Sequence, residues 1–141
     1  MNPDDRAAIC DLLNRYAEAL DTRAWELLDE VFADDAVFEF GEFRTRTRAE
    51  AVAMIRSHLD GCGPTQHLLG NHRVEIDGDR AFSHVYVRAF HLDRNEDSGR
   101  TYEMFGEYRD ELRRTAEGWR SVHRRGKVFF ELGTREVLGP G

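Results

Sequence analysis

Asp21 and His67 are the residues whose types and surroundings most directly suggest chemistry. Asp21 follows an amphipathic stretch that ends at Leu20, so it lies at the junction of two predicted helices. His67 lies at the start of a predicted strand. A carboxylate that accepts a hydrogen bond from one imidazole nitrogen orients the ring and leaves the other nitrogen to act as a base. If the two side chains meet in a pocket, they predict an enzyme that transfers protons without a metal or cofactor.

Both residues also have a structural interpretation. Asp is a preferred N-cap, and a second helix is predicted to begin near Thr22, so Asp21 could simply cap it. The residue three positions later is Ala24, so no capping box supports that interpretation. His67 could be a hydrogen-bonded histidine of the core. The residues alone leave both alternatives open, and a capping Asp can also point into a pocket.

Two further polar side chains are predicted to face the same space. Tyr16 lies on the apolar stripe of the first helix, one turn before Leu20, and a buried hydroxyl needs a partner. His91 ends a strand face of small residues that would leave room for a ligand. Tyr16 could equally be a core aromatic residue, and His91 a structural residue at a strand end.

The spacing of apolar residues predicts an α+β domain. Helical periodicity and turn signals place helices at about 5–20, 22–32 and 48–60, and strands at 36–40, 65–76, 80–92, 100–113 and 119–131. Sequential hairpins make the last four strands an antiparallel meander. Three helices can cover one face of such a sheet. The concavity between a curved sheet and its helices is a common place for a ligand.

Alternation along the strands predicts which face each side chain occupies. In the strand 80–92, the face that ends at His91 carries small residues, whereas the other face carries Phe82, Tyr86 and Phe90 and suits an outer surface or a partner subunit. In the strand 65–76, His67 is out of phase with Val74, so a bulge is predicted near Gly70. In the last strand, Arg125 shares a face with Trp119, Ser121 and His123.

The composition excludes several classes of protein. The 141 residues carry a net charge of −7, with 40% hydrophobic and 33% charged residues, which predicts one soluble domain over residues 1–141 with a tail from about residue 133 that is not fixed to it. The acidic balance argues against nucleic-acid binding, and no apolar run is long enough to span a membrane. The acidic N-terminus lacks a signal-peptide pattern, so a cytoplasmic protein is expected. Cys10 and Cys62 are predicted to be free thiols, and no metal or cofactor motif is present.

The order and spacing of several segments resemble the SnoaL-like, scytalone dehydratase-like branch of the nuclear-transport-factor-like superfamily. The segments are Tyr16-x-x-x-x-Asp21, the stretch at Trp25, Phe32-Ala-Asp-Asp-Ala36, Gln66-His-Leu-x-x-Asn71, Tyr108-x-Asp-x-Leu and Gly118-Trp-Arg120. The resemblance spans about residues 6–130. It implies a cone-shaped α+β fold, with a curved antiparallel sheet packed on three helices around a deep pocket, and a homodimer formed through the sheet face.

The resemblance also implies roles for individual residues. Asp21 and His67 would form a catalytic dyad. The implied substrate-binding residues are Tyr16, Trp25, His91, Tyr108 and Arg125. Arg124, one phase away on the same strand, could replace Arg125. The cyclases of this group use another acid–base arrangement, so the family alone does not determine the reaction.

Three hypotheses about function follow. The first is a cofactor-independent lyase or isomerase of the dehydratase type that acts on a small, largely apolar cyclic, polyketide- or steroid-like substrate, with Tyr16 and His91 hydrogen-bonding an oxyanion or protonating a leaving hydroxyl. The second is a polyketide cyclase of the aldol type, which would close a ring without losing water. The third is a non-catalytic ligand-binding or assembly module, in which Asp21 and His67 would lie beyond hydrogen-bonding distance.

Overall fold

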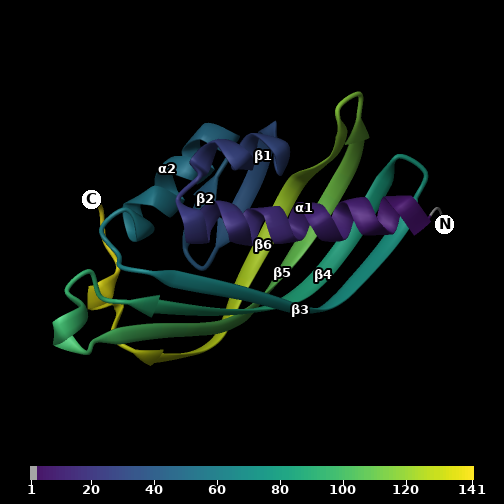
Figure 1. Ribbon diagram of the computed structural model, residues 1–141. Coiled ribbons are helices and arrows are strands. Elements are labelled where there is room, and N and C mark those ends of the chain that lie inside the picture. Colours follow the sequence, from purple (N-terminus) through teal and green to yellow (C-terminus); the bar gives the residue numbers. More distant parts are fainter. Residues whose placement is uncertain (1–2) are drawn as a thin grey trace.

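The amphipathic N-terminal segment forms helix α1, Pro3–Thr22, in a computed structural model that describes residues 3–141 (Figure 1). The helix extends beyond the predicted range of 5–20 at both ends. Its apolar stripe faces the sheet, and Ile9, Leu13 and Tyr16 are almost completely buried there. Burial of this stripe fixes the rotation of α1 about its axis, and therefore the direction in which Tyr16 points.

The second helix is shorter than the predicted range of 22–32 and is not an α-helix. The structure has a short 3₁₀ helix, η1, Trp25–Glu30, in its place. Arg23 adopts a left-handed backbone with φ of 59°, which ends α1, and Ala24 offers no side-chain cap for a new helix. The residue after η1, Val31, already bonds to the sheet, because its carbonyl accepts a hydrogen bond from the backbone N–H of Ser121.

Strand β1, Phe32–Phe40, starts earlier than the predicted strand 36–40 and joins an unexpected neighbour. It pairs antiparallel with β2, Phe43–Thr45, and parallel with β6, Gly118–Gly133. With β3 at Thr65–Asp77, β4 at Arg80–Leu92 and β5 at Thr101–Thr115, the strand order is β2-β1-β6-β5-β4-β3. The sheet is thus mostly antiparallel, with β1 and β6 as the one parallel pair among the described strands. A parallel pair needs a long connection, and the chain between β1 and β6 is long enough to provide it.

The predicted antiparallel meander of the last four strands is confirmed. The remaining strands are β3, Thr65–Asp77, β4, Arg80–Leu92, and β5, Thr101–Thr115. The bulge near Gly70 is also present, with Asn71 in the left-handed region at φ of 55°. Because the bulge shifts the register, Leu69 and Val74 are both half-buried despite their opposite phase in the sequence.

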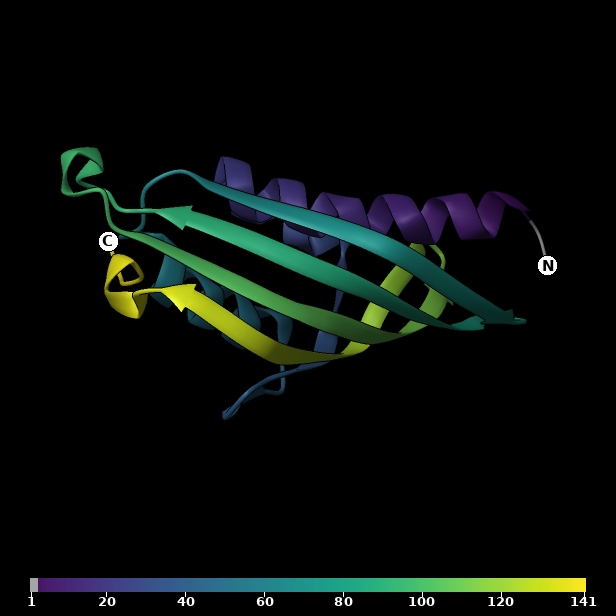
Figure 2. The same ribbon diagram turned by 90° about the horizontal axis from the view of Figure 1, so that it is seen from below.

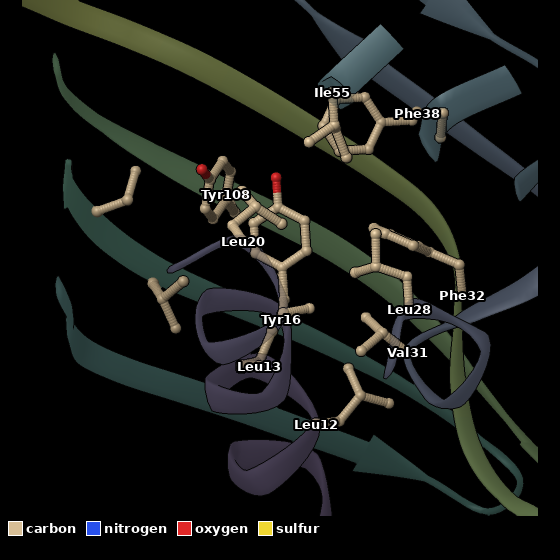
Figure 3. Packing of buried hydrophobic residues seen from close by; sticks show 14 of the residues in the cluster. Leu12, Leu13, Tyr16, Leu20, Leu28, Val31, Phe32, Phe38, Ile55 and Tyr108 are labelled. Atoms are coloured by element: carbon tan, nitrogen blue, oxygen red, sulfur yellow. The ribbon is translucent and has the colours of Figure 1, made fainter. Parts of the chain in front are cut away.

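A capped second helix and η1 complete the layer over the concave face of the sheet. Helix α2, Arg48–Leu59, begins after Thr47, whose side chain accepts a hydrogen bond from the backbone N–H of Glu50 as predicted. The core lies between α1, η1, α2 and the strands, and Figure 3 shows residues of this cluster from Leu12 to Phe38. Figure 2 shows the helices on one side of the long, curved strands. Within residues 3–141, no helix has the length and apolar character needed to cross a membrane.

The C-terminal tail, for which the sequence predicts mobility, packs against the domain. After the 3₁₀ turn η2, Glu96–Ser98, and strand β6, the chain forms a last turn, η3, Arg135–Val137. Val137 is buried, and the N–H of Gly61 donates to the carbonyl of Gly139 at 2.7 Å. A buried side chain and backbone pairing hold the tail although its sequence shows no periodicity.

Asp5 ties the first turn of α1 to the end of the β5–β6 hairpin. Its carboxylate accepts two hydrogen bonds from Arg114, each at 2.8 Å, and one from the indole N–H of Trp119 at 3.2 Å. The bonds from Arg114 and then Trp119 lower the pKa of Asp5 from 3.8 to about 2. This pair was not anticipated, because the partners lie at opposite ends of the sequence.

We expect Asp5 to make stability depend on pH in acid. Its folded-state pKa lies below the unfolded value, so its contribution is fully present above about pH 4 and is lost as the pH falls towards 2. Asp5→Asn should therefore be less stable than the wild type at neutral pH, and the two should converge near pH 2. Urea unfolding followed by circular dichroism at several pH values measures this, with the exposed Asp11→Asn as control. A stability difference that does not change with pH would contradict it.

Candidate active site

The carboxylate of Asp21 holds the start of β3 through three hydrogen bonds. It accepts from the ring Nδ1 of His67 at 2.7 Å, from the backbone N–H of His67 at 2.8 Å and from the hydroxyl of Thr65 at 2.9 Å. Asp21 lies in the last turn of α1 and caps no helix in the described chain. The structure therefore brings the carboxylate and the imidazole into contact, and the capping alternative is excluded.

The contact between Asp21 and His67 determines which ring nitrogen is available for chemistry. A carboxylate can only accept, so Nδ1 of His67 carries the proton and donates it. In residues 3–141, Nε2 has no hydrogen-bond partner, and the side chain is only 5% exposed. Nε2 is thus a fixed basic nitrogen at the wall of a cavity.

The charge on Asp21 is maintained by its donors. Burial raises the pKa of this carboxyl, but the bonds from the ring and backbone of His67, together with that from Thr65, outweigh it and hold the pKa below the usual value. Asp21 is therefore ionised at neutral pH. A permanent carboxylate next to Nδ1 stabilises the imidazolium that forms when Nε2 takes a proton.

The cavity lies between the sheet and the helices and has a volume of about 900 Å³. Much of its wall is apolar and aromatic, with residues such as Leu20, Phe38, Phe40, Ile55, Leu59, Met104 and Leu138. The polar part of the wall comes from His58, His67, His91, Tyr16, Tyr102 and Tyr108 and from the charged side chains Glu42, Lys127 and Arg135. A cavity of this size and lining fits a small, mostly apolar molecule with a few oxygen atoms.

His91 presents a second unprotonated ring nitrogen to the cavity. Its Nδ1 lies 2.9 Å from the carbonyl of Tyr102, which can only accept, so Nδ1 carries the proton. Burial lowers the pKa of His91 to about 4, so the ring is neutral at physiological pH and Nε2 is an acceptor. The ring centres of His91 and His67 are 5.7 Å apart, and the planes are nearly perpendicular. A single ligand can therefore contact both imidazoles.

Tyr16 and Tyr108 supply the hydrogen-bond donors. Their rings meet edge to face with centres 5.5 Å apart, and Figure 3 shows both hydroxyls pointing in the same direction. Burial raises the pKa of both phenols, so both hydroxyls stay protonated at neutral pH. The site thus combines two acceptors, His67 and His91, with two phenol groups that also interact with each other.

The family assignment follows from comparison with known proteins. Residues 3–125 match the SnoaL-like domain family, a segment that contains Asp21, His67 and His91. The chain belongs to the SnoaL-like family. A relative from Mycobacterium tuberculosis, named as uncharacterized protein Rv2910c, is 33% identical over 127 residues, covering 85% of this chain and 82% of the relative.

Solved structures place this SnoaL-like domain in the nuclear-transport-factor-like fold. An NTF2-like protein with a cystatin-like fold from Novosphingobium aromaticivorans is 27% identical with a TM-score of 0.76, covering 89% of this chain and 82% of that one. The hexachlorocyclohexane dehydrochlorinase from Novosphingobium barchaimii has a TM-score of 0.79 at 19% identity, covering 92% and 89% of the two chains. The likeness to the dehydrochlorinase shows the fold alone.

Two residues expected to bind substrate in the SnoaL-like domain lie outside the cavity. Trp25 is partly buried against the core and lines a separate groove with Arg56, whose guanidinium carbon lies 5.8 Å from the centre of its ring. Arg125 is 55% exposed and pairs with Glu39. The pairing of β5 with β6 shifts register between Glu111 and Leu112, so β6 has one extra residue after Ser121. The alternation of inward and outward side chains is therefore reversed beyond that point, and Arg124 faces inwards in place of Arg125.

Arg23 and Thr65 are site residues that the sequence did not indicate. The guanidinium of Arg23 donates to the hydroxyl of Thr65 at 2.9 Å and to the carbonyl of Gly63 at 2.7 Å. Thr65 in turn donates to Asp21. Together they tie the end of α1 to the start of β3 and so hold the dyad. Their only signal in the sequence is position, since each lies two residues from a dyad member.

Proposed function

We propose that this SnoaL-like domain is a cofactor-independent lyase or isomerase in which His67, oriented by Asp21, removes a proton from carbon. The observation that carries the proposal is the 2.7 Å hydrogen bond between Nδ1 of His67 and Asp21 at the wall of an apolar cavity. The proposed substrate is a small, largely apolar cyclic, polyketide- or steroid-like molecule with a carbonyl group and a leaving group. A non-catalytic module would not require a basic nitrogen held in this way.

The proposed reaction begins with proton transfer to Nε2 of His67. The electron pair of the C–H bond moves towards the adjacent carbonyl, and the hydroxyl of Tyr16 or Tyr108 donates to the developing oxyanion. In a dehydration, the enolate electrons expel the β-hydroxyl, and the protonated His67 returns its proton to that oxygen, so water leaves. In an isomerisation, the proton returns to another carbon. Each route restores the neutral imidazole.

His91 is proposed to have a different role from the donor role that the first hypothesis assigned to it. A neutral ring whose Nδ1 proton is bound to Tyr102 cannot protonate a leaving group. Its Nε2 can accept a hydrogen bond from a hydroxyl of the substrate. We therefore assign His91 to orientation of the hydroxyl, and proton delivery to His67.

Deuterium exchange tests the proposal without knowledge of the natural substrate. The protein is incubated in D₂O with a panel of cyclic β-hydroxy ketones, and NMR follows deuterium at the α-carbon and the appearance of the enone. We expect catalysed exchange or dehydration of at least one compound by the wild type, and neither by His67→Ala. Ring closure without loss of water would instead identify a cyclase. Ligands that bind the cavity but neither exchange nor react would contradict a catalytic role.

We further propose that the outer face of the sheet binds a second copy of the chain. Seven large apolar side chains are exposed on strands β3, β4 and β6 of this face: Leu68, Phe82, Tyr86, Phe90, Phe129, Phe130 and Leu132. Apolar patches of this kind are uncommon on monomers. Phe130→Glu should convert a homodimer into a monomer, as measured by light scattering after size-exclusion chromatography. A wild-type monomer at micromolar concentration would contradict the proposal.

A further inference from the structure

Arg124 is a buried cation that the proposed reaction has not used. Its side chain is 0% exposed, as is that of Asp110, whose carboxylate accepts from Nε of Arg124 at 2.9 Å. Ser121 donates to the same carboxylate at 2.7 Å. The two terminal nitrogens of the guanidinium, by contrast, have no hydrogen-bond partner in the described chain. A buried cation with unsatisfied nitrogens is costly and calls for a physical explanation.

The positive end of this ion pair lies against the two tyrosines of the cavity. The central carbon of the guanidinium is 4.2 Å from the ring centre of Tyr16 and 4.5 Å from that of Tyr108. Phe32 lies farther away, at 5.3 Å. The tyrosines line the cavity, whereas Arg124 does not. Arg124 therefore lies behind the rings and can act on a ligand only through them.

We infer that Arg124 is a positioning residue that holds the Tyr16 and Tyr108 rings and strengthens their hydroxyls as donors to an oxyanion in the cavity. A cation on the face of a phenol is attracted to the ring and favours negative charge on its oxygen. The charges near the phenols have opposite effects, because Arg124 lowers and Asp110 raises the pKa of Tyr16. Burial has the largest effect on both phenols, and of the two charges Arg124 has the larger effect on each.

The inference deepens the proposed function, because it rests on an oxyanion forming beside these tyrosines. It implies that ligands with a planar, delocalised oxyanion, such as enolates and phenolates, bind more tightly than neutral molecules of the same shape. A purely structural Arg124 would affect both kinds of ligand equally. This difference gives a test that does not require turnover.

The probe is p-nitrophenol, whose visible absorbance reports ionisation while it is bound. A pH titration in the presence of the protein gives the ratio of affinities for the phenolate and the phenol, and p-nitroanisole, which cannot ionise, controls for shape. The test variant is Arg124→Met combined with Asp110→Asn, which removes both buried charges and so avoids an unpaired carboxylate. Arg125→Met, at the exposed neighbouring position, is the matched control.

We expect the double variant to lose about tenfold of the preference for phenolate, with binding of p-nitroanisole little changed. Arg124→Lys, which keeps the charge, should retain part of the preference. In a Tyr16→Phe/Tyr108→Phe background, the Arg124 substitution should have little further effect, because the groups through which it acts are gone. Arg125→Met should match the wild type.

An unchanged preference in the folded double variant would overturn the inference, as would equal loss of p-nitroanisole binding or failure of the wild type to bind either probe. The outcome is separable from that of the proposed function. His67→Ala removes the base but leaves the tyrosines and Arg124 in place, so a preference for phenolate can persist in a protein that catalyses no proton transfer.

Discussion

Replacing His67 by Ala should lower turnover by about 10²–10⁴-fold, and Asp21→Asn should cause a loss of similar size. His67 supplies the only nitrogen proposed to take the proton. Asp21 sets its tautomer and its direction through the bond to Nδ1 at 2.7 Å. An amide at position 21 cannot satisfy the three donors from Thr65 and His67 in the same way, because one of its two terminal atoms is itself a donor. The measurement is steady-state kinetics on the compound that the exchange experiment identifies.

The double substitution should be little worse than either single change, because the two residues act as one unit. Asp11→Asn, on the exposed side of α1, is the control for loss of a carboxylate elsewhere. Circular dichroism and thermal unfolding should show that all variants remain folded. Full activity in either single variant would show that the hydrogen bond observed between these residues has no catalytic role.

Asp110→Ala should reduce the free energy of unfolding by about 3–5 kcal/mol. The substitution leaves the guanidinium of Arg124 buried without a counterion and removes the acceptor of the Ser121 hydroxyl. Removing both charges, with Asp110→Asn and Arg124→Met, should restore most of the lost stability, because no uncompensated charge then stays buried and the amide oxygen at position 110 can still accept from Ser121. Urea unfolding monitored by circular dichroism measures both effects, and an unchanged m-value shows that the comparison is valid.

A solvent-exposed ion pair provides the control. Glu30→Ala breaks the contact with Arg15, in which both side chains are substantially exposed, and should cost less than about 1 kcal/mol. Two outcomes would contradict the prediction: Asp110→Ala no more destabilising than Glu30→Ala, or the double variant less stable than Asp110→Ala. Either would show that burial does not determine how much the Arg124–Asp110 pair contributes to the free energy of unfolding.

Patterns with a regular period predicted much of the fold. Alternation along β4 correctly placed Ala81, Val85 and His91 on the buried face and Phe82 on the exposed face. The apolar stripe of α1 correctly predicted that Tyr16 is buried. These predictions hold because side-chain direction in a regular element follows from the backbone repeat alone.

The errors occur where the repeat is interrupted. A register shift in β6 exchanges Arg124 for Arg125, and a left-handed residue at Arg23 followed by an uncapped turn replaces a predicted helix by η1. The parallel pairing of β1 with β6 has no local signal, because it depends on which sheet edge is left free by the rest of the chain.

For the candidate site, the sequence by itself determined that a carboxylate and an imidazole stand at the ends of two regular elements, with Tyr16 and His91 in phase with them. Only the tertiary structure decided that Asp21 and His67 are in contact, that Thr65 and Arg23 hold them, and that Arg124 lies behind the tyrosines. Local periodicity specifies the direction of a side chain within its own element. The distance between elements depends on packing and hydrogen bonds between residues more than forty positions apart.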